Sequence, residues 1–335
     1  MINLTANYGG SMSILKNAVG QMPCSLKNDY MFRATLQTSN LALKGLTAAL
    51  LHMPPEEVVS VEITNPVELG KSIEAKDFIL DLRVLLNNET IVNMEMQVLN
   101  LGNWPERSLG YLCRSFDSLN RGQDYLEVRP VIQICFLDFT LFKDDPEFYS
   151  TYMFINVKKH TIYSDKLKLS VVDLTKIENA TEEDRLYGID RWARLFKATT
   201  WEEMKALAEQ SDFLREASEA FYRLSAEEKI RLQCEAREEY YRQQRYVERR
   251  MKMLEEAEEK ITIAEEKLAV SEEKLAVSEE KLAARDQTLA QKNWELTQKD
   301  QELSQKDQEL AQKDQQLARL SAELEALKQS SKTER

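Results

Sequence analysis

The residues best suited to chemistry lie in one stretch, residues 78–99, which reads FILDLRVLLNNETIVNMEMQVL. It contains two runs of residues that favour strands, and the turn-forming pair Asn87-Asn88 separates them. Asp81 lies on the first run, and Glu95 and Gln97 lie on the second. The oxygen atoms of these side chains suit Mg²⁺, Mn²⁺ or Ca²⁺ better than zinc.

The apolar residues of the two runs fix how the strands must pair. Leucine and valine alternate with polar residues in the first run, and methionine and valine do so in the second. Because both apolar sets must face one core, residues opposite each other must have numbers with an even sum, for example 84 with 94. That parity needs a loop of odd length, or a bulge, around residues 87–90. Asp81 is then expected on the same face as Glu95 and Gln97.

Two interpretations of this polar face remain open. Adjacent carboxylates repel each other, and a divalent cation is a common way to offset that repulsion. The alternative is a solvated outer face, which is usual for a half-buried antiparallel hairpin.

The Asp81 to Glu95-x-Gln97 spacing on paired strands resembles the core of PD-(D/E)xK nucleases, and specifically the recombination-promoting nuclease family, also called PD-(D/E)xK family transposases. The similarity runs in order from about residue 27 to about residue 251. Seven segments carry it: KNDYMF (27–32), VEITNP (61–66), KDFILDLRV (76–84), NMEMQVLN (93–100), RSLGYLCRSF (107–116), VIQICFLDF (131–139) and DRWARLFKATTWEEM (190–204).

The resemblance implies an α/β (α+β) fold with the restriction-endonuclease-like αβββαβ core. It also implies a metal-dependent DNA endonuclease that hydrolyses phosphodiester bonds and is linked to recombination and mobile elements. In that family mechanism, Asp81, Glu95 and the carbonyl of Met96 hold Mg²⁺, or Mn²⁺ in its place. Gln97 stands where the broader superfamily has lysine, so its amide would orient water or phosphate without supplying charge.

Four further residues match positions of the family. Asp29 and Lys27 match an acidic and a basic position ahead of the hairpin, and the resemblance implies a catalytic role for Asp29 and a phosphate or DNA contact for Lys27. The alternative for Asp29 is ordinary placement in the first turn of a helix, where an acid complements the helix dipole. Arg107 and Tyr111 lie one turn apart on a predicted helix and could hold a phosphate or orient Glu95. A surface arginine beside a partly buried tyrosine is the alternative.

Composition limits how the chain can meet DNA, its implied partner. The 335 residues carry a net charge of −12, and residues 1–150 contain 12 Lys and Arg against 18 Asp and Glu. Non-specific affinity for nucleic acid comes from basic residues that neutralise phosphates, so a passive polyanion binder is disfavoured. Any DNA contact needs a local basic patch. The run at 242–252 could supply one, or it is a solvated helix face.

Cysteine spacing and hydropathy exclude other classes of protein. The four cysteines have no CxxC spacing and no nearby histidines, which disfavours a zinc site, and the chain's size disfavours a disulfide framework. Cys113 and Cys135 are expected in the core. Without a signal-peptide pattern or an apolar run near 18 residues, we expect a cytoplasmic protein without membrane contact.

Periodicity predicts the elements that position the site. We expect helices over 26–37 and from Ser39 or Asn40 to about 52, and strands over 58–64, 131–139, 152–157 and 167–174. A helix should begin at 103–105 and bury Leu109, Leu112, Phe116 and Leu119. Helices should follow over 185–198 and 201–210, the latter with Thr200 and Glu203 in a capping box.

The last third of the chain repeats every seven residues. One aliphatic residue recurs at that spacing, at positions 261, 268, 275, 282, 289, 296, 303, 310, 317 and 324. Together with the absence of Pro and Gly from 189 to 335, this predicts a long helix, with a left-handed supercoil if it self-associates. Because polar residues occupy most of the second heptad position, a weak homo-oligomer, a bundle and a single charged helix all remain open.

These patterns predict four parts: a leader with little order (1–21), a nuclease domain (22–180), a helical extension (181–254) and a heptad-repeat coiled coil (255–335). They also leave a second function open, in which a catalytically weak or inactive nuclease fold acts as a scaffold through its coiled tail.

Overall fold

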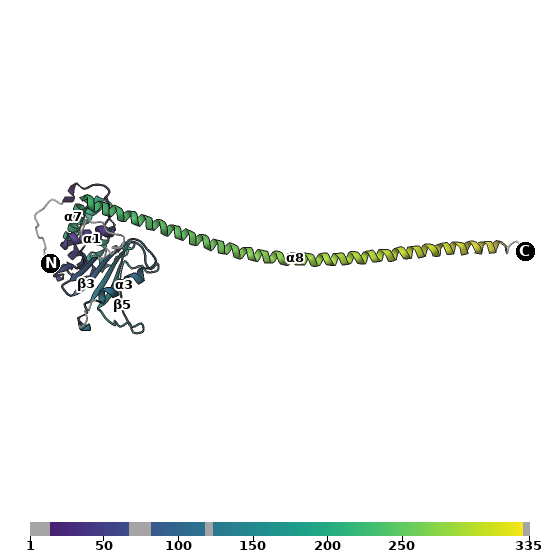
Figure 1. Cartoon of the computed structure of the whole chain (residues 1–335), viewed down its shortest axis with the longest axis horizontal. Coiled ribbons are helices and arrows are strands. Elements are labelled where there is room, and N and C mark those ends of the chain that lie inside the picture. Colours follow the sequence, from purple (N-terminus) through teal and green to yellow (C-terminus); the bar gives the residue numbers. More distant parts are fainter. Residues whose placement is uncertain (1–13, 67–81, 118–122, 331–335) are drawn as a thin grey trace. The chain divides into compact units, whose positions relative to one another are not determined.

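The computed structural model describes residues 14–66, 82–117 and 123–330, and its contacts divide the chain into two units, residues 1–249 and 250–335. In the first unit, helices pack on both faces of a mixed sheet (Figure 1). The described strands lie in the order β1-β2-β3-β4-β6-β5. Their bounds are β1 (Val61–Ile63), β2 (Leu82–Leu86), β3 (Thr90–Gln97), β4 (Val131–Leu137), β5 (Tyr149–Met153) and β6 (Leu167–Asp173).

The helices follow the predicted order, with one difference in the second half. They are α1 (Asp29–Thr38), α2 (Asn40–Leu50), α3 (Trp104–Phe116), α4 (Glu182–Tyr187), α5 (Ile189–Lys197), α6 (Trp201–Ala208), α7 (Asp212–Ala226) and α8 (Glu228–Ser330). The sequence predicted one helix over 185–198, but Gly188 ends α4 in a left-handed conformation with φ 81°. The predicted capping box of Thr200 and Glu203 is confirmed at the start of α6.

The predicted parity of the β2–β3 hairpin is confirmed. The strands pair Leu82 with Met94, Val84 with Val92 and Leu86 with Thr90, so the residue numbers of every pair have an even sum. The register differs by two residues from the example given above, because Val84 lies opposite Val92 and not opposite Met94. The loop has three residues, and Asn87 and Asn88 adopt φ of 49° and 58°. Asparagine tolerates this left-handed region better than most residues, which explains how the odd-length loop forms.

The next connection sets up the parallel part of the sheet. β3 pairs with β4 in parallel, and β4 with β6, so the chain crosses the sheet between β3 and β4 through α3. Helices α1 and α2, the hairpin with β1, then α3 and β4 give the αβββαβ core that the sequence predicted. The fold is consistent with the PD-(D/E)xK class.

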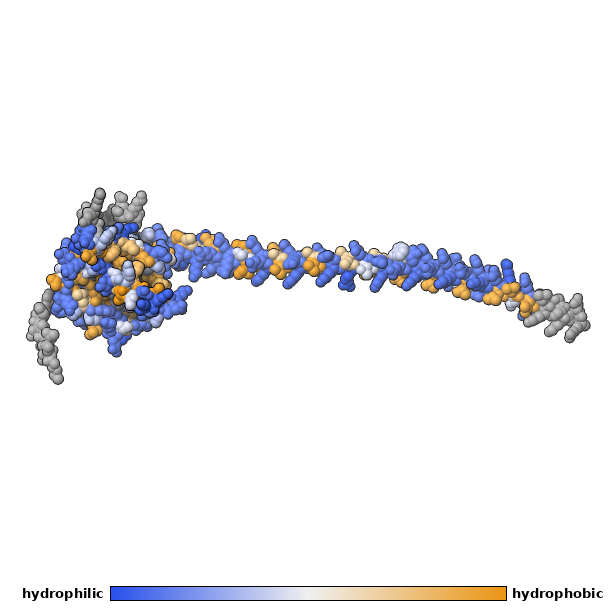
Figure 2. All heavy atoms as spheres, turned by 90° about the horizontal axis from the view of Figure 1, so that it is seen from below, coloured by the Kyte–Doolittle hydropathy of each residue, from blue (hydrophilic) through white to orange (hydrophobic). Residues whose placement is uncertain are grey.

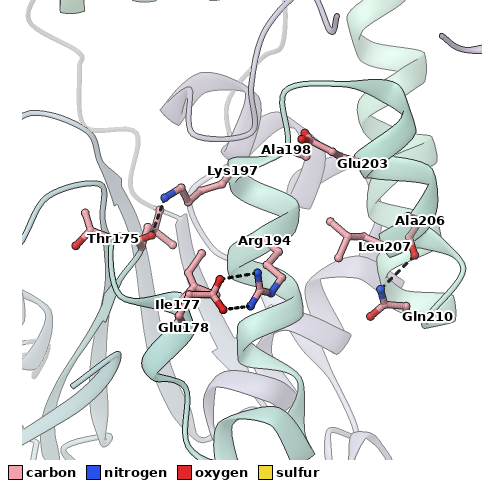
Figure 3. Close-up of a pocket in the computed structure, with 11 residues that line it drawn as sticks. Thr175, Ile177, Glu178, Arg194, Lys197, Ala198, Glu203, Ala206, Leu207 and Gln210 are labelled. Carbon is pink, nitrogen blue, oxygen red and sulfur yellow. Dashed lines mark hydrogen bonds and ion pairs between the residues drawn. The ribbon is translucent and has the colours of Figure 1, made fainter. Parts of the chain in front are cut away.

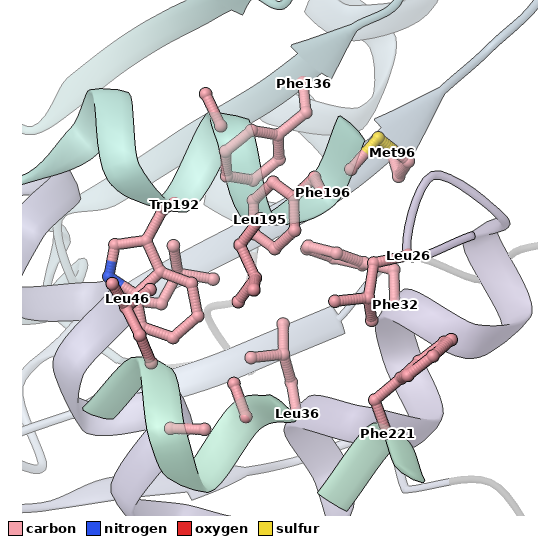
Figure 4. Close-up of a cluster of buried hydrophobic side chains, with 14 of the residues drawn as sticks. Leu26, Phe32, Leu36, Leu46, Met96, Phe136, Trp192, Leu195, Phe196 and Phe221 are labelled. Atoms are coloured by element: carbon pink, nitrogen blue, oxygen red, sulfur yellow. The ribbon is translucent and has the colours of Figure 1, made fainter. Parts of the chain in front are cut away.

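An aromatic cluster joins α1, α5 and the sheet (Figure 4). Phe136 on β4 lies with its ring centroid 5.5 Å from that of Phe32 and 5.1 Å from that of Phe196, and the last two are 5.4 Å apart. All three side chains are fully buried. Aromatic rings bury large apolar areas, so this cluster fixes α1 and α5 against the face of the sheet opposite α3.

The helices of the predicted extension, which begins at residue 181, share a buried core with the sheet. Trp192, Met204 and Phe221 share one buried cluster with the strands, and so does Cys234 in the first turns of α8. The first compact unit accordingly continues to residue 249.

Four local expectations are corrected. The strand expected over 152–157 lies earlier in the chain, as β5 (Tyr149–Met153). Leu15 and Ala18 are buried and Gln21 bridges to Thr200, so residues 14–21 pack against the core and do not belong to a leader with little order. Leu109 on α3 is 47% exposed, because α3 buries Trp104, Ser108 and Leu112. Cys113 is exposed, while Cys135 is buried as predicted. Leu119 lies outside the described residues.

The second unit is the continuation of α8, which is helical as far as Ser330. The aliphatic residues of its heptads, from Ile261 to Leu324, are 55–64% exposed. No helix in the described part of the chain combines the length and the apolar content that crossing a bilayer requires.

Gly45 lets α2 approach α7 closely, which leads to a stability prediction. A Cβ atom there would lie 2.3 Å from Cγ of Phe213, so Gly45→Ala should lower the free energy of unfolding by about 1–3 kcal/mol. Urea unfolding followed by tryptophan fluorescence measures it. Gly110→Ala on α3 is the matched control, because nothing lies within 4 Å of its Cβ position and it should stabilise by about 1 kcal/mol. Equal stability of Gly45→Ala and wild type would contradict the close packing.

Candidate catalytic site

Glu95 is a buried carboxylate on the central part of the sheet. It lies on β3, only 5% exposed, and its Oε1 accepts a hydrogen bond from Nη2 of Arg107 on α3 at 2.7 Å. A charged group at this depth needs a charged partner, which Arg107 supplies. The solvated-face interpretation is therefore wrong for Glu95, because α3 covers this face of the sheet.

Arg107 is held by two aromatic rings of its own helix. Its guanidinium carbon lies 5.6 Å from the ring centroid of Trp104 and 5.4 Å from that of Tyr111. These cation–π contacts fix the orientation of the guanidinium, and its side chain keeps 30% of its surface exposed. Arg107 thus contacts Glu95 directly and Tyr111 packs on Arg107, while both roles considered for Arg107 stay predictions.

A buried polar network beside Glu95 was not predicted. Nδ2 of Asn93, also on β3, donates to Oγ of Ser115 at 2.7 Å and to Oε1 of Gln133 at 3.2 Å. Gln133 interrupts the apolar run of β4 directly opposite Asn93 in the parallel register. A polar residue inside an otherwise apolar strand was the available signal. The network satisfies polar groups that would otherwise be costly under α3.

Gln97 marks the carboxyl end of β3, where Lys27 also lies. The side-chain Nε2 of Gln97 donates a hydrogen bond to the backbone carbonyl of Leu99 at 2.9 Å. The backbone carbonyl of Gln97 accepts one from the backbone N–H of Asp138 at 3.0 Å. The Asp138 carboxylate accepts a hydrogen bond from Nζ of Lys27 at 2.7 Å, which forms an ion pair. The structure thus brings Lys27 to the strand end that carries Gln97, through an aspartate that the sequence analysis did not single out.

The backbone carbonyl of Met96 points toward β2, the strand on the other side of β3 from β4. The carbonyl of Gln97 points to the β4 side, and carbonyls alternate along a strand, so that of Met96 points to the β2 side. Asp81 directly precedes β2 in the sequence but lies outside the described residues. Its expected pairing with Glu95 therefore stays a prediction.

The oxygen donors of this region fit a hard divalent cation better than a soft one. Glu95 supplies a carboxylate, Met96 a carbonyl and Gln97 an amide, so the expected donors on β3 are all oxygen atoms. The described residues contain no group of three acidic, histidine or cysteine side chains spaced to hold a metal. A complete ligand set thus depends on Asp81.

Asp29 is buried and its carboxylate binds Arg237 of α8. Nε of Arg237 donates to Oδ1 at 2.8 Å and to Oδ2 at 2.9 Å, and Nη2 also donates to Oδ2. The side chains are 8% and 12% exposed. Burial would lower the pKa of Arg237, but the hydrogen bonds and charge of Asp29 raise it overall; burial, followed by the Asp29 charge, raises the pKa of Tyr241 beside them.

Glu62 and the pocket near α5 lie outside this arrangement. Glu62 on β1 is exposed. A pocket of about 530 Å³ lies between the turn at Ile177 and helices α5 and α6, where Arg194 and Glu178 form two hydrogen bonds (Figure 3). None of its lining residues is a predicted site residue.

The Asp29–Arg237 pair generates a stability prediction. Removing either side chain leaves the other charge buried without its ion-pair partner, so Asp29→Ala and Arg237→Ala should each lower the free energy of unfolding by about 3–5 kcal/mol. The double variant should lose less than the sum of the two. Urea unfolding measures all three. The control is Arg242→Ala, whose exposed pair with Glu239 should cost about 0–1 kcal/mol. Additive losses would contradict a direct interaction.

Comparison with known proteins gives one match, to a family model. A comparison with curated proteins and one with solved structures returned no significant match. A family model, described as PD-(D/E)XK nuclease family transposase, matches residues 26–251, more than half of the chain. This span contains the β2–β3 hairpin, α3 with Arg107 and the first turns of α8 with Arg237. The chain therefore belongs to the PD-(D/E)XK nuclease family transposases.

Proposed function

We propose that the chain is a Mg²⁺-dependent DNA endonuclease that hydrolyses phosphodiester bonds, with Mn²⁺ as a possible substitute for Mg²⁺. The observation that carries the proposal is the buried Glu95 carboxylate, which is bound to Arg107. Glu95 lies on β3, which pairs with β2, the strand that Asp81 directly precedes in the sequence. Family membership makes a nuclease the first expectation. A role in the cytoplasm, in recombination or in mobile elements, is part of the same proposal.

In this mechanism Asp81, Glu95 and the Met96 carbonyl would hold the metal ion. When bound, the ion supplies a Lewis acid that lowers the pKa of a coordinated water and offsets charge on the scissile phosphate. Arg107 keeps Glu95 oriented through its 2.7 Å bond, and Tyr111 keeps Arg107 in place. The Arg107 side chain, which is 30% exposed, also suits contact with a DNA phosphate.

Gln97 and Lys27 share the role that one lysine has in the broader superfamily. Gln97 orients water or phosphate through its amide, and Lys27 supplies positive charge at the same strand end through its contact with Asp138. Asp29, for which we predicted a catalytic role, has its carboxylate bonded to Arg237. These contacts favour a positioning role for Asp29, which holds the segment that carries Lys27.

The second candidate function is a scaffold with weak or absent catalysis that acts through its tail. It is favoured by the exposed aliphatic residues of α8, which suit self-association into a homo-oligomer. This function requires no cleavage, so activity separates it from the first.

Plasmid nicking tests the nuclease. We expect wild type to nick DNA with Mg²⁺ or Mn²⁺ and not with EDTA, and Asp81→Ala or Glu95→Ala to lower the rate about 10²-fold or more, because each removes a metal-binding carboxylate. Nicking rates over a range of metal concentrations measure the effect. Glu62→Ala is the control, since Glu62 is an exposed acid on a neighbouring strand.

The outcomes separate the two functions. Full activity in both Asp81→Ala and Glu95→Ala would reject this site. Folded protein that binds metal yet never nicks DNA would favour the scaffold.

Lys27 gives a further prediction for the same assay. Loss of its ammonium should slow nicking by Lys27→Ala about 10- to 100-fold, the usual effect of losing one charge-assisted contact. Gln97→Lys in the Lys27→Ala background should recover part of the rate by returning a cation to the strand end. Lys16→Ala, an exposed lysine on another segment, is the control. A Lys27→Ala rate equal to wild type would exclude the role of Lys27.

A further inference from the structure

The tail part of α8 exposes one narrow aliphatic stripe along its whole length, besides Ile263, Val270 and Val277 in its first half. Its leucines recur every seven residues and are more than half exposed along the whole length from 261 to 324 (Figure 2). A coiled coil needs a second position in each heptad to complete its seam. Four residues after each heptad residue from Ile261 to Leu317 the chain has Glu, Asp, Asn or Ser, so the second position must lie three residues after it.

The residue at that second position changes along the tail. In the first half it is small, in the second half it is mostly lysine, and near the end it is Leu320. The small residues are Ala257, Ala264, Ser271 and Ser278; the long cationic ones are Arg285, Lys292, Lys299, Lys306 and Lys313. At the second seam position, the first half of the tail therefore has small uncharged side chains, and the second half has long cationic ones.

We propose that the tail binds a second copy of this chain in antiparallel orientation, with Ile261 of one copy packed against Leu320 of the other. Antiparallel coiled coils place the first seam position of one helix opposite the second seam position of its partner. In this register the leucines of the second half meet the small residues of the first half. The pairs are Ala257 with Leu324, Ala264 with Leu317, Ser271 with Leu310 and Ser278 with Leu303.

The charges that flank the seam agree with this register. Residues directly before the leucines face each other across an antiparallel pair, and they are lysines in the first half and mainly glutamates in the second. The register joins Lys260 with Glu323, Lys274 with Glu309 and Lys281 with Glu302, and two-fold symmetry forms each pair twice.

Acidic residues also meet on the other flank, and the seam lysines compensate them. Glu279 of one copy lies beside Asp300 of the other, and Lys299 of the seam lies next to both. The long lysine stem covers the facing leucine while its ammonium reaches these carboxylates.

A parallel pair fits the sequence less well. In register, each residue of the seam faces its own copy, so Lys292, Lys299, Lys306 and Lys313 would each meet an identical lysine. On the flanks, Glu295 would face Asp300, and the next two heptads would repeat this acidic pair. The favourable flanking pairs of a parallel dimer are confined to its first half. The antiparallel arrangement spreads favourable contacts over the full length of the tail.

The inference rests on the proposed self-association of the tail and is independent of catalysis. It adds orientation and register: residue 250 of each copy lies at an opposite end of the paired segment. A parallel pair would bring both copies of residue 250 to the same end.

Disulfide cross-linking in the full-length chain tests the orientation. In a background with exposed Cys113 replaced by serine, we would make Ile261→Cys and Leu320→Cys chains that differ in mass through a tag, and oxidise each alone and after co-expression. We expect a mixed disulfide on a non-reducing gel from the co-expressed chains and none from either chain alone. A disulfide requires the two Cα atoms to approach within about 7 Å, so it reports the seam directly.

Controls and further outcomes make the result specific. Glu266→Cys, on the outer side of the helix, should give no disulfide with Leu320→Cys. Cross-linking of Ile261→Cys with itself would show a parallel pair and overturn the proposal. A mixed disulfide of Leu320→Cys with Leu254→Cys, and not with Ile261→Cys, would overturn the register. A monomer mass in sedimentation equilibrium would overturn self-association itself, and nicking by the same protein would still decide the nuclease separately.

Discussion

The alternation of side chains along β3 is the constraint on which the site depends. Met94 and Met96 belong to the core that α1 and α5 cover, so Glu95 between them must point to the opposite face, beneath α3. A shift by one residue would bury Glu95 against the aromatic cluster and turn the methionines toward Arg107. The three-residue loop and the parallel pairing with β4 exclude that shift, because each fixes the same register from a different side.

The second constraint joins the N-terminal edge of α1 to α8. Asn28 caps α1 through its side-chain oxygen, and its Nδ2 donates to the carbonyl of Cys234 at 3.2 Å and to Glu238 at 3.1 Å. Asp29 binds Arg237. Lys27, the preceding residue, thus reaches Asp138 from a segment that α8 holds. The first turns of α8 therefore hold the segment that carries Lys27, and the family match includes them, since it extends past the sheet to residue 251.

Sequence reasoning reached the features that alternation and capping dictate. The hairpin parity, the burial of β4 and the capping box at Thr200 are local patterns with few physical solutions. Contacts between distant segments had no such pattern: Arg237 lies 208 residues from Asp29, within a run whose charges equally suit a solvated helix. Leu109 was misassigned because the face of α3 that meets the sheet is set by Trp104 and Ser108.

Charge pairing in this region explains how an acidic chain can present a site to DNA. Glu95, Asp138 and Asp29 each lie in contact with a cation, from α3, from the segment before α1 and from α8 respectively. Each pair is close to neutral, so the site adds little repulsion against an approaching phosphate. The three cations differ in how much of their side chain is exposed to solvent. Arg237 is 12% exposed, whereas Arg107 and Lys27 are 30% and 26% exposed. Of these three cations, Arg107 and Lys27 therefore keep the side-chain surface that contact with a phosphate would need under the proposed nuclease function, whereas Arg237 does not.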